Sequence, residues 1–175
     1  METKQTYTVS IYTENTVGLL NRISAIFQRR KVNIESFNSS KSEIKSVSRI
    51  TLLVKVTESK IKKIIGQIEK QVEVIKAYYH TDNETIYQES CLFKLHANLL
   101  TGNNEIQAII NDNKTQITHI NKDFFVLEKS GNRDDIEDLY HLLEKYGIMQ
   151  FVRSGRIAIT KDQLKISSII AKYNK

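Results

Sequence analysis

The sequence predicts an α+β fold made of two tandem βαββαβ units. Three observations lead to this fold class: short runs of alternating apolar residues are typical of strands, the runs are separated by stretches with helical spacing, and the same order occurs twice. The 175 residues leave room for two small domains. A content of 40% hydrophobic and 26% charged residues is ordinary for a globular protein.

The first unit is expected over residues 1–80. Its order is that of the ferredoxin-like split βαβ unit, in which two helices cover one face of an antiparallel sheet. The other face is expected to stay open, and because so small a sheet commonly buries a free face or edge against a second copy, a dimer is predicted. The expected elements are strands Thr6–Tyr12, Val32–Asn38, Val47–Val56 and Val72–Tyr79, helices Val17–Arg30 and Ile61–Ile68, and a polar turn at Ser39–Ser42.

Residues 81–89 are mostly polar and are predicted to link the first unit to a second domain over residues 90–175. This domain repeats the topology, without matching the first residue by residue, and is also expected to be ferredoxin-like. Past Lys161, isoleucines at 166, 169 and 170 have helical spacing and predict either a docking helix or a frayed end. The expected elements are strands Cys91–Ala97, Thr115–Ile120, Phe124–Glu128 and Ile148–Ile159, and helices around Ile106–Ile110 and Ile136–Leu143, the latter opened by Asn132–Asp135.

Composition excludes several classes of protein. Cys91 is the only cysteine and lies in an apolar alternating run, so it is expected to be a buried small hydrophobe without a disulfide. No window has the ~20 apolar residues that cross a bilayer, and the first residues lack the apolar part of a secretory signal, so a cytoplasmic protein with no membrane partner is expected. The net charge of +6 is scattered over helix ends and polar faces, and therefore does not predict a nucleic-acid partner.

The sequence contains no recognisable active site. The four histidines, His80, His96, His119 and His141, are dispersed and have no metal-ligand spacing, so neither a catalytic nor a metal site is predicted. The glycine-rich dinucleotide motif, the P-loop and the GxSxG motif are all missing. A non-catalytic protein that carries no cofactor of its own is expected.

One turn has the features of a binding site. Residues Glu14–Arg22 leave the first strand and open the first helix, whose first N–H groups lack intrahelical partners and can receive a small carboxylate. Gly18 allows a ligand or a neighbouring backbone to approach closely. Asn15 can cap the helix, which is the purely structural interpretation, or can turn its amide toward a ligand.

Four segments of the first unit closely resemble the N-terminal ACT domain of the acetohydroxyacid synthase (acetolactate synthase) small subunit. The most specific of them is the run Asn33-Ile34-Glu35-Ser36. In the second unit, Phe151–Gly155 is similar to the Arg-Ser/Thr-Gly signature near the end of that family. Lys31 stands where the family usually has glycine. The four segments are Tyr12–Arg22, Ile26–Arg30, Val32–Ser36 and Ser48–Thr51.

This resemblance implies a regulatory subunit without an active site. Family members act in the biosynthesis of isoleucine and valine. They bind and activate a large catalytic subunit, which carries thiamine diphosphate, magnesium and FAD, and they transmit feedback inhibition by valine or another branched-chain amino acid. The resemblance further implies a homodimer through the ACT domains with the effector at their interface. The effector would contact Asn15, Val17 and Gly18, with Asn33 and Ile34 supplied from across the dimer interface.

Three other functions compete with this interpretation. A stand-alone ACT-type amino-acid sensor would bind its ligand without a synthase partner. An RRM-like nucleic-acid-binding module shares the fold, but it stacks bases on aromatic residues of its central strands. The predicted strand Ser48–Val56 contains no aromatic residue, and Tyr7 and Tyr12 lie on opposite faces of theirs. A small enzyme on the same fold would need reactive side chains that the sequence does not bring together.

Overall fold

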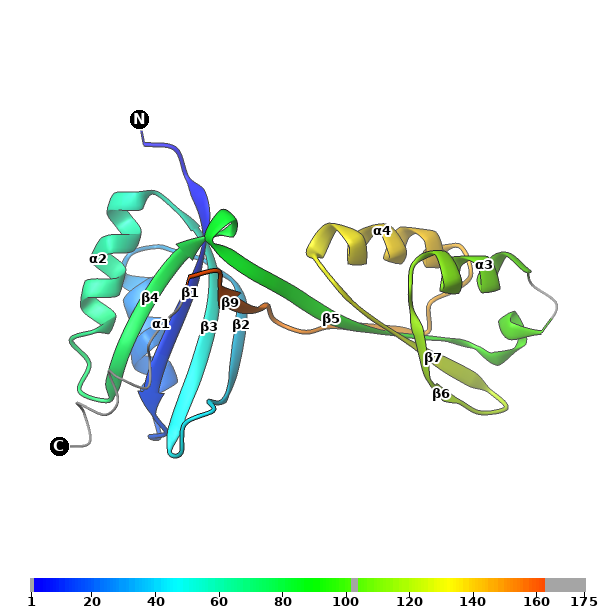
Figure 1. Ribbon diagram of the computed structural model, residues 1–175, viewed down its shortest axis with the longest axis horizontal. Helices are drawn as coiled ribbons and strands as arrows, with labels where there is room; N and C mark the ends of the chain where they lie inside the picture. The colour runs from blue at the N-terminus through cyan, green and yellow to red at the C-terminus, as the bar shows by residue number, and fades with distance from the viewer. Residues whose placement is uncertain (1, 102–103, 163–175) are drawn as a thin grey trace. The chain divides into compact units, whose positions relative to one another are not determined.

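The chain forms two compact units in the computed structural model, which describes residues 2–101 and 104–162 (Figure 1). Among these residues, unit 1 runs to Tyr87 and takes up the chain again at Arg156, whereas unit 2 is Gln88–Gly155. Each unit has its own cluster of buried hydrophobic side chains. The predicted fold class, two tandem α+β units, is confirmed.

Unit 1 is a four-stranded antiparallel sheet with two helices on one face, as Figure 1 shows. The strand order is β2-β3-β1-β4, which is the order of a split βαβ unit. The central pair β1 and β3 stays in register over its whole length, from Gln5 opposite Val56 to Glu14 opposite Val47. The elements are β1 (Gln5–Glu14), α1 (Leu19–Arg29), β2 (Ile34–Lys41), β3 (Val47–Val56), α2 (Glu58–Ile68) and β4 (Val74–Thr81).

The core of unit 1 follows from two sequence periods. Alternation along β1 and β3 turns one row of side chains toward the helices, and a spacing of three or four residues turns one stripe of each helix toward the sheet. The bulkiest of these side chains are at most 1% exposed, and full burial of an apolar side chain contributes about 1.5–3 kcal/mol of hydrophobic stabilisation. The largest of them are Tyr7, Ile11, Ile23, Ile26, Phe27, Ile50, Leu52, Ile61, Ile64 and Ile68.

Helix α1 ends at a lysine in the left-handed region. Lys31 has φ +52°, its N–H donates to Gln28 O at 2.9 Å, and the Val32 N–H donates to Phe27 O at 3.0 Å. These two bonds form a Schellman motif, in which the left-handed residue is usually glycine. A lysine completes the motif at a cost in backbone strain. Lys114, with φ +51°, occupies the same position after helix α3 (Asn104–Asp112) in unit 2.

Replacing Lys31 by glycine is expected to raise the free energy of unfolding of unit 1 by about 1 kcal/mol, because glycine adopts this φ without a Cβ clash. Urea unfolding followed by circular dichroism measures the change. Lys114→Gly is expected to stabilise unit 2 similarly. Lys63→Gly is the control, because Lys63 is exposed inside α2, where glycine is unfavourable. This variant is expected to lower the free energy of unfolding by about 1 kcal/mol. A loss of stability in the Lys31 variant would contradict the assignment of strain.

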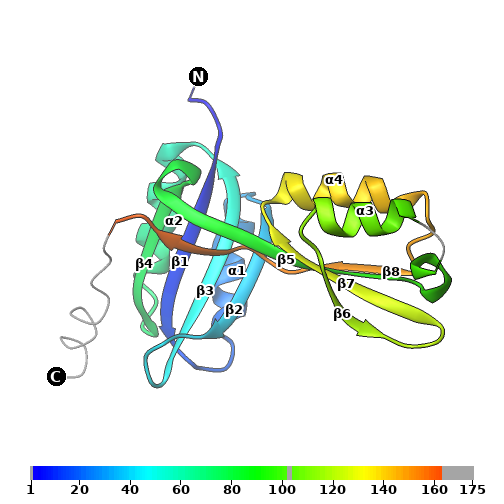
Figure 2. The ribbon, with the colours of Figure 1, turned by 45° about the vertical axis from the view of Figure 1, so that its right-hand side comes forward.

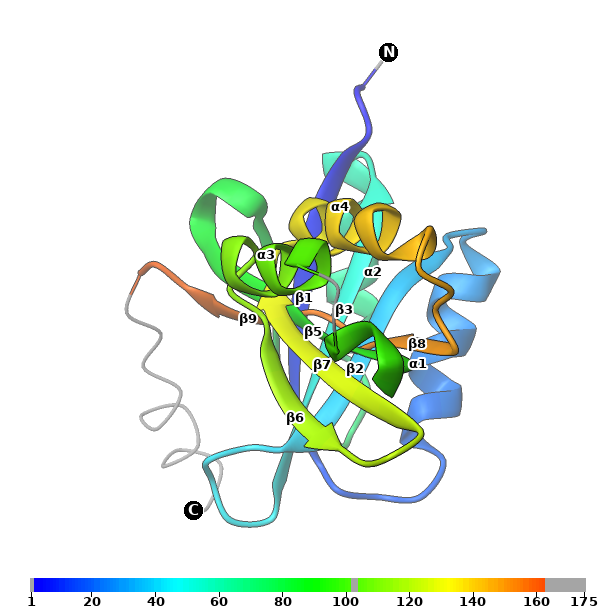
Figure 3. The same cartoon turned by 90° about the vertical axis from the view of Figure 1, so that its right-hand side faces the viewer.

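Unit 2 repeats the same topology, with helices α3 and α4 on one face of its sheet (Figures 2 and 3). The path through this sheet is β6-β7-β5-β8, and strand β9 (Ile157–Thr160) pairs with β5 off that path. Asn132 caps α4, since its Oδ1 accepts from the Asp135 N–H at 2.9 Å. The elements are β5 (Thr85–His96), α3 (Asn104–Asp112), β6 (Gln116–Ile120), β7 (Phe124–Gly131), α4 (Arg133–Glu144) and β8 (Gln150–Arg153), with short 3₁₀ helices η1 (Asp82–Glu84) in unit 1 and η2 (Ala97–Leu100) in unit 2.

Cys91 lies in the core of unit 2, as predicted, and is 1% exposed. Its Sγ donates to the Lys129 carbonyl at 3.4 Å. Burial raises the pKa of the Cys91 thiol, so the reactive thiolate is scarcer at neutral pH than in an exposed cysteine.

The native protein is therefore expected to react with a thiol reagent such as DTNB at pH 8 at least about 100-fold more slowly than the unfolded chain, since exposure of the sulfur requires opening of the core. The rate is read from the absorbance of the released thiolate, with the protein in urea as the reference. Equal rates in the native and unfolded states would show that Cys91 is accessible.

The boundaries between the units differ from the predicted ones. The expected linker at 81–89 forms η1 and the start of β5, and the expected strand Ile148–Ile159 is two strands, β8 and β9 (Ile157–Thr160). The reason is that polar residues occupy buried strand positions: Thr85 and Glu89 are 5% and 3% exposed, in the same alternation as Cys91. A hydropathy pattern does not distinguish such residues from a linker. The turn predicted at Ser39–Ser42 lies later in the chain, because β2 pairs with β3 as far as Lys41 and the chain turns at residues 43–46.

The face of the unit 1 sheet opposite its helices is covered, contrary to the prediction of an open face. Figures 1 and 2 show β9 lying across this face. The Arg49 guanidinium reaches from β3 to the carbonyl of Ala158 in β9, and also donates to Ser10 Oγ at 3.2 Å. Side chains of this face are accordingly buried: Thr8, Ser10, Tyr12, Thr51 and Leu53 are all 6% exposed or less.

Arg156 directly precedes β9, and its contacts hold β9 on the unit 1 sheet. Its guanidinium forms an ion pair with Asp82, donates to Thr8 Oγ1 at 3.0 Å, and lies 3.6 Å from the centre of the Tyr87 ring. Its backbone N–H donates to Ser36 Oγ at 2.8 Å. The side chain is only 5% exposed. The segment is thus held mainly by buried polar contacts, which have no local signature in the sequence.

The helix predicted beyond Lys161 lies outside the described residues. In the part of the chain that is described, none of the helices is long and apolar enough to cross a membrane.

Candidate functional site

A pocket of ≈ 300 Å³ lies where β1 ends and α1 begins. The turn that the sequence singles out forms one wall, including the predicted residues Asn15, Val17 and Gly18. The sheet forms the floor, through Thr13 of β1, Ser39 of β2, and Ser48 and Ile50 of β3. The structure therefore brings three of the five predicted site residues to one pocket.

Helix α1 begins without a side-chain cap. Its N-cap residue is Gly18, with φ +82°, and no side-chain hydrogen bond to the helix start is present among the described residues. The capping role for Asn15, which the sequence left open, is therefore not observed. The first intrahelical bond is that from the Arg22 N–H to Gly18 O, at 3.3 Å. The N–H groups of the first turn, Leu19 to Asn21, are thus available to an anion at the positive end of the helix dipole.

The other two predicted residues, Asn33 and Ile34, are not part of this pocket. Ile34 starts β2 opposite Val54, whereas Ser39 lies near the other end of the strand, opposite Ile50. Five residues of extended chain span about 17 Å, so Asn33 is remote from Gly18 within one chain. The assignment of these residues to a site shared between two copies stays a prediction.

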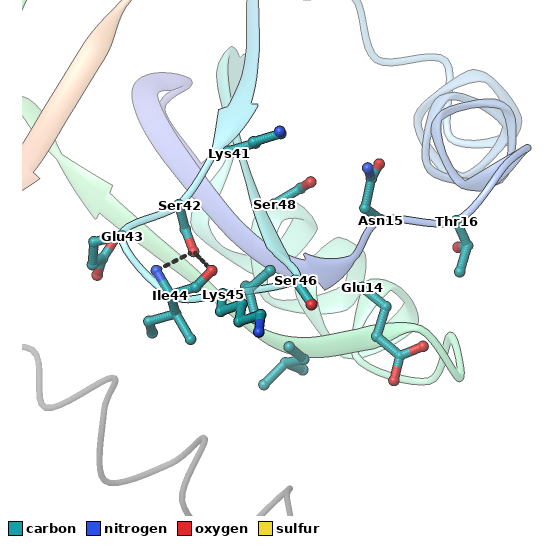
Figure 4. Close-up of a pocket in the computed structure, with 12 residues that line it drawn as sticks. Glu14, Asn15, Thr16, Lys41, Ser42, Glu43, Ile44, Lys45, Ser46 and Ser48 are labelled. Atoms are coloured by element: carbon teal, nitrogen blue, oxygen red, sulfur yellow. Dashed lines mark hydrogen bonds between the residues drawn. The ribbon is translucent and has the colours of Figure 1, made fainter.

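A second, larger pocket of ≈ 730 Å³ adjoins the first at the hairpin between β2 and β3 (Figure 4). It shares Glu14, Asn15, Thr16 and Ser48 with the smaller pocket. Figure 4 shows that the side chains of Asn15 and Ser48 come from different elements and face the same opening. The sequence did not single out the hairpin side chains or the hydroxyl residues of the floor, because they become neighbours only through strand pairing.

Arg22 carries a positive charge beside the small pocket. Its guanidinium pairs with the Glu73 carboxylate, and the two side chains are 44% and 24% exposed. A side chain built onto Gly18 would have Arg22 Nη1 as its nearest neighbour, at 4.0 Å from the Cβ. The pocket can therefore accommodate a small substituent at position 18 without a clash.

The Arg153-Ser154-Gly155 run, which resembles the late family signature, has a structural role in unit 2. Arg153 Nε lies 3.3 Å from Glu89 Oε2, and Arg153 Nη1 donates to Glu137 Oε2 at 2.9 Å. The Ser154 N–H donates to Ser90 O at 2.8 Å, and Ser154 Oγ accepts from the Ser90 N–H at 2.9 Å. The contacts with Glu89 and Ser90 hold this run against β5, and the contact with Glu137 joins it to α4.

The histidines are dispersed in the structure as they are in the sequence. His80 stacks on Tyr78 and His119 on Phe124, with ring centres 6.3 and 5.5 Å apart. Among residues 2–101 and 104–162, no three side chains of His, Cys, Asp or Glu gather in a way that could hold a metal ion.

Comparison with known proteins agrees with this architecture. The model of the AHAS small subunit-like ACT domain matches residues 9–76, and the model described as the small subunit of acetolactate synthase matches residues 88–162. The "Acetolactate synthase small subunit" of Bacillus subtilis is 33% identical over 162 residues, covering 91% of this chain and 94% of the relative. The "Probable acetolactate synthase small subunit" of Archaeoglobus fulgidus is 30% identical over 159 residues, covering 91% and 99%.

The fold is shared with a solved structure. The crystal structure of the acetolactate synthase small subunit from Thermotoga maritima superimposes with a TM-score of 0.81 at 24% identity, covering 91% of this chain and 99% of that one. The fold and its matching sequence model define a two-domain protein whose first domain is an ACT domain. The chain belongs to the acetolactate synthase small subunit family, and is a regulatory subunit of that enzyme.

Proposed function

We propose that this protein activates the large catalytic subunit of acetolactate synthase and transmits feedback inhibition by valine or another branched-chain amino acid. The main support for an effector site is the pocket of ≈ 300 Å³ at the uncapped start of α1. Its volume is at the lower end of the range for small-molecule sites, which suits a single amino acid. The large subunit would supply thiamine diphosphate, magnesium and FAD, and the complex would work in the cytoplasm.

The charges of an amino acid match the pocket. A carboxylate at the start of α1 would accept from the free N–H groups of the first turn and would be stabilised by the helix dipole. The Glu14 carboxylate, on the same wall, provides an acceptor for the α-ammonium group. Leu19 and Ile50, both among the lining residues, offer apolar surface to a branched side chain.

The topology of unit 1 supports a dimer that completes this site. β2 is an edge strand, so its outer edge is available for pairing with a second copy. In a two-fold dimer with antiparallel β2 strands, the start of one β2 lies opposite the end of the other. Asn33 and Ile34 of one copy would then approach Ser39 and the Asn15–Gly18 turn of its partner. This arrangement accounts for two groups of predicted residues that lie far apart in one chain.

Asn33→Ala is accordingly expected to weaken effector binding about tenfold, through loss of a hydrogen bond to the ligand across the dimer interface. Isothermal titration of the full-length dimer measures the affinity, and analytical ultracentrifugation checks that the dimer persists. Asn38→Ala, within β2 but away from the lining of the pocket, is the control. Unchanged affinity in the Asn33 variant would exclude its role in the site.

The proposal is tested by measuring acetolactate formation by the matching large subunit, alone and with this protein, across a titration with valine, leucine and isoleucine. Activation together with inhibition by one of them supports both parts. Activation without inhibition would retain the regulatory subunit and reject the effector site. Ligand binding without activation would indicate a stand-alone sensor.

A further inference from the structure

A small apolar cluster lies on the face of the unit 1 sheet that is turned away from the helices. Its buried members are Tyr12 of β1 and Val47 of β3, which are 2% and 7% exposed. Ile44 of the β2–β3 hairpin, and Ile75 and Tyr78 of β4, pack against them. This group, the outer cluster, shares no residue with the core under the helices. It is therefore a separate apolar surface of unit 1.

Part of the outer cluster borders open space. Ile44, Val47 and Ile75 line the pocket of ≈ 730 Å³ at the hairpin between β2 and β3. Strand β9 crosses the same face nearer its other end, where Arg156 donates to Thr8 Oγ1 (Figures 1 and 2). Burial of apolar side chains by a covering segment is favourable because it removes their surface from water. The outer cluster thus offers both room and a driving force for such a segment.

The chain that follows β9 can reach this cluster. The Lys161 N–H donates to the Glu84 carbonyl at 2.9 Å, so the described chain ends beside η1, which directly follows β4. Thr81 and Ile75, six residues apart on β4, are separated by about 20 Å. Residues 163–175 would also span about 20 Å as a helix. They are therefore long enough to run along β4 from η1 to the outer cluster.

The sequence of residues 163–175 has the pattern of a helix that packs by one side. Three isoleucines and a tyrosine recur at the spacing i, i+3, i+4 and i+7, which places them on one stripe. So short a helix is only marginally stable alone in water, and it therefore needs an apolar surface to pack on. The stripe is Ile166, Ile169, Ile170 and Tyr173, and the opposite side is Lys165, Ser168, Lys172 and Lys175.

We infer that residues 163–175 form an amphipathic helix whose apolar stripe packs on the outer cluster of the same chain. Unit 1 then has a helix on each face of its sheet, and the outer cluster is closed to a second copy and to the large subunit. The inference goes beyond the proposed function, since neither activation nor an effector enters it.

Hydrogen exchange of the full-length protein, followed by mass spectrometry, tests the inference. Amides of residues 166–173 are expected to exchange at least about tenfold more slowly than those of a synthetic peptide of residues 163–175. Ile169→Asp places a charge on the apolar stripe and is expected to remove this protection. Ser168→Asp is the matched control, because it adds the same charge on the opposite side of the helix and should leave the protection intact.

A second pair of variants tests the place where the segment packs. Ile44→Asp, in the outer cluster, is expected to remove the protection of residues 166–173 as well. Ile120→Asp is its control, since this isoleucine of β6 is 57% exposed and belongs to unit 2. Exchange at the rate of the free peptide, or equal protection in the two variants of either pair, would overturn the inference. Protection that is lost on dilution would overturn it in favour of packing on a second copy, and protection that requires the large subunit would overturn it in favour of that partner.

Discussion

Replacing Arg156 by methionine is expected to lower the free energy of unfolding by about 2–4 kcal/mol. The side chain is 5% exposed, and it makes an ion pair with Asp82, a hydrogen bond to Thr8 and a close stack on Tyr87. Removing one member of a buried pair typically costs about 3–5 kcal/mol. The lower range is expected here because Asp82 is 40% exposed, so water can solvate its carboxylate once the guanidinium is gone.

The same substitution should detach the segment that follows. β9 carries Ile157 and Ile159, which are 50% and 58% exposed, and only Ala158 is buried between them. Without Arg156 the strand retains its pairing with β5 and the bond from Arg49 to Ala158, but little apolar packing. Faster hydrogen exchange at residues 157–160 is therefore expected before any global unfolding.

Urea unfolding followed by circular dichroism measures the global effect, and hydrogen exchange with mass spectrometry measures the local one. Arg22→Met is the matched control, because the ion pair of Arg22 with Glu73 is partly exposed to water and should contribute at most about 1 kcal/mol. An equal loss in the free energy of unfolding in the two variants would mean that the burial of Arg156 does not strengthen its contacts. A stable variant with unchanged exchange at β9 would contradict the anchoring role.

Gly18→Asp is expected to weaken effector binding by at least about tenfold. The new carboxylate would stand at the start of α1, where the effector carboxylate is proposed to bind, and two like charges a few ångströms apart repel by more than 1.4 kcal/mol in a partly buried site. The site has room for the side chain, and aspartate is one of the few residues that tolerate the left-handed φ of +82°. The variant is therefore expected to fold.

Gly18→Asn separates charge from shape, because asparagine has the same size and the same tolerance of this φ but is neutral. Titration of the two variants with the effector, together with inhibition of the assembled synthase, measures the effect. Activation in the absence of effector reports whether each variant still assembles. If the aspartate and asparagine variants lose the same affinity, the loss is steric and the carboxylate is not bound at the helix start.

Most of the elements could be predicted from the sequence because their apolar patterns are strong. The strand Val47–Val56 was predicted with its observed bounds, and α1 differs from its prediction by two residues at the start and one at the end. The predictions failed where polar residues are buried or paired. The predicted linker is wrong at Thr85 and Glu89, which alternate inward in β5, and the predicted turn is wrong at Ser39–Lys41, which pair with β3.

The candidate site was predictable only in part, for the same reason. The turn Asn15–Gly18 is contiguous in sequence and precedes a clear helix, so local chemistry was enough to identify it. Thr13, Ser39 and Ser48 are separated along the chain and meet only because β1, β2 and β3 are neighbours in the sheet. Only the family resemblance implies Asn33 and Ile34, and a single copy of the chain does not bring them to the pocket.

The sequence by itself determined the order of the elements, the two α+β units and the family, because strand and helix periods are local patterns and the family motifs are contiguous. Only the tertiary structure decided where unit 1 ends, what covers its sheet and which hydroxyls line the pocket. Those features depend on partners far apart in sequence, such as Arg156 with Asp82 and Thr8. A buried polar side chain is stable only with such a partner, and no local pattern identifies a partner that the fold alone brings close.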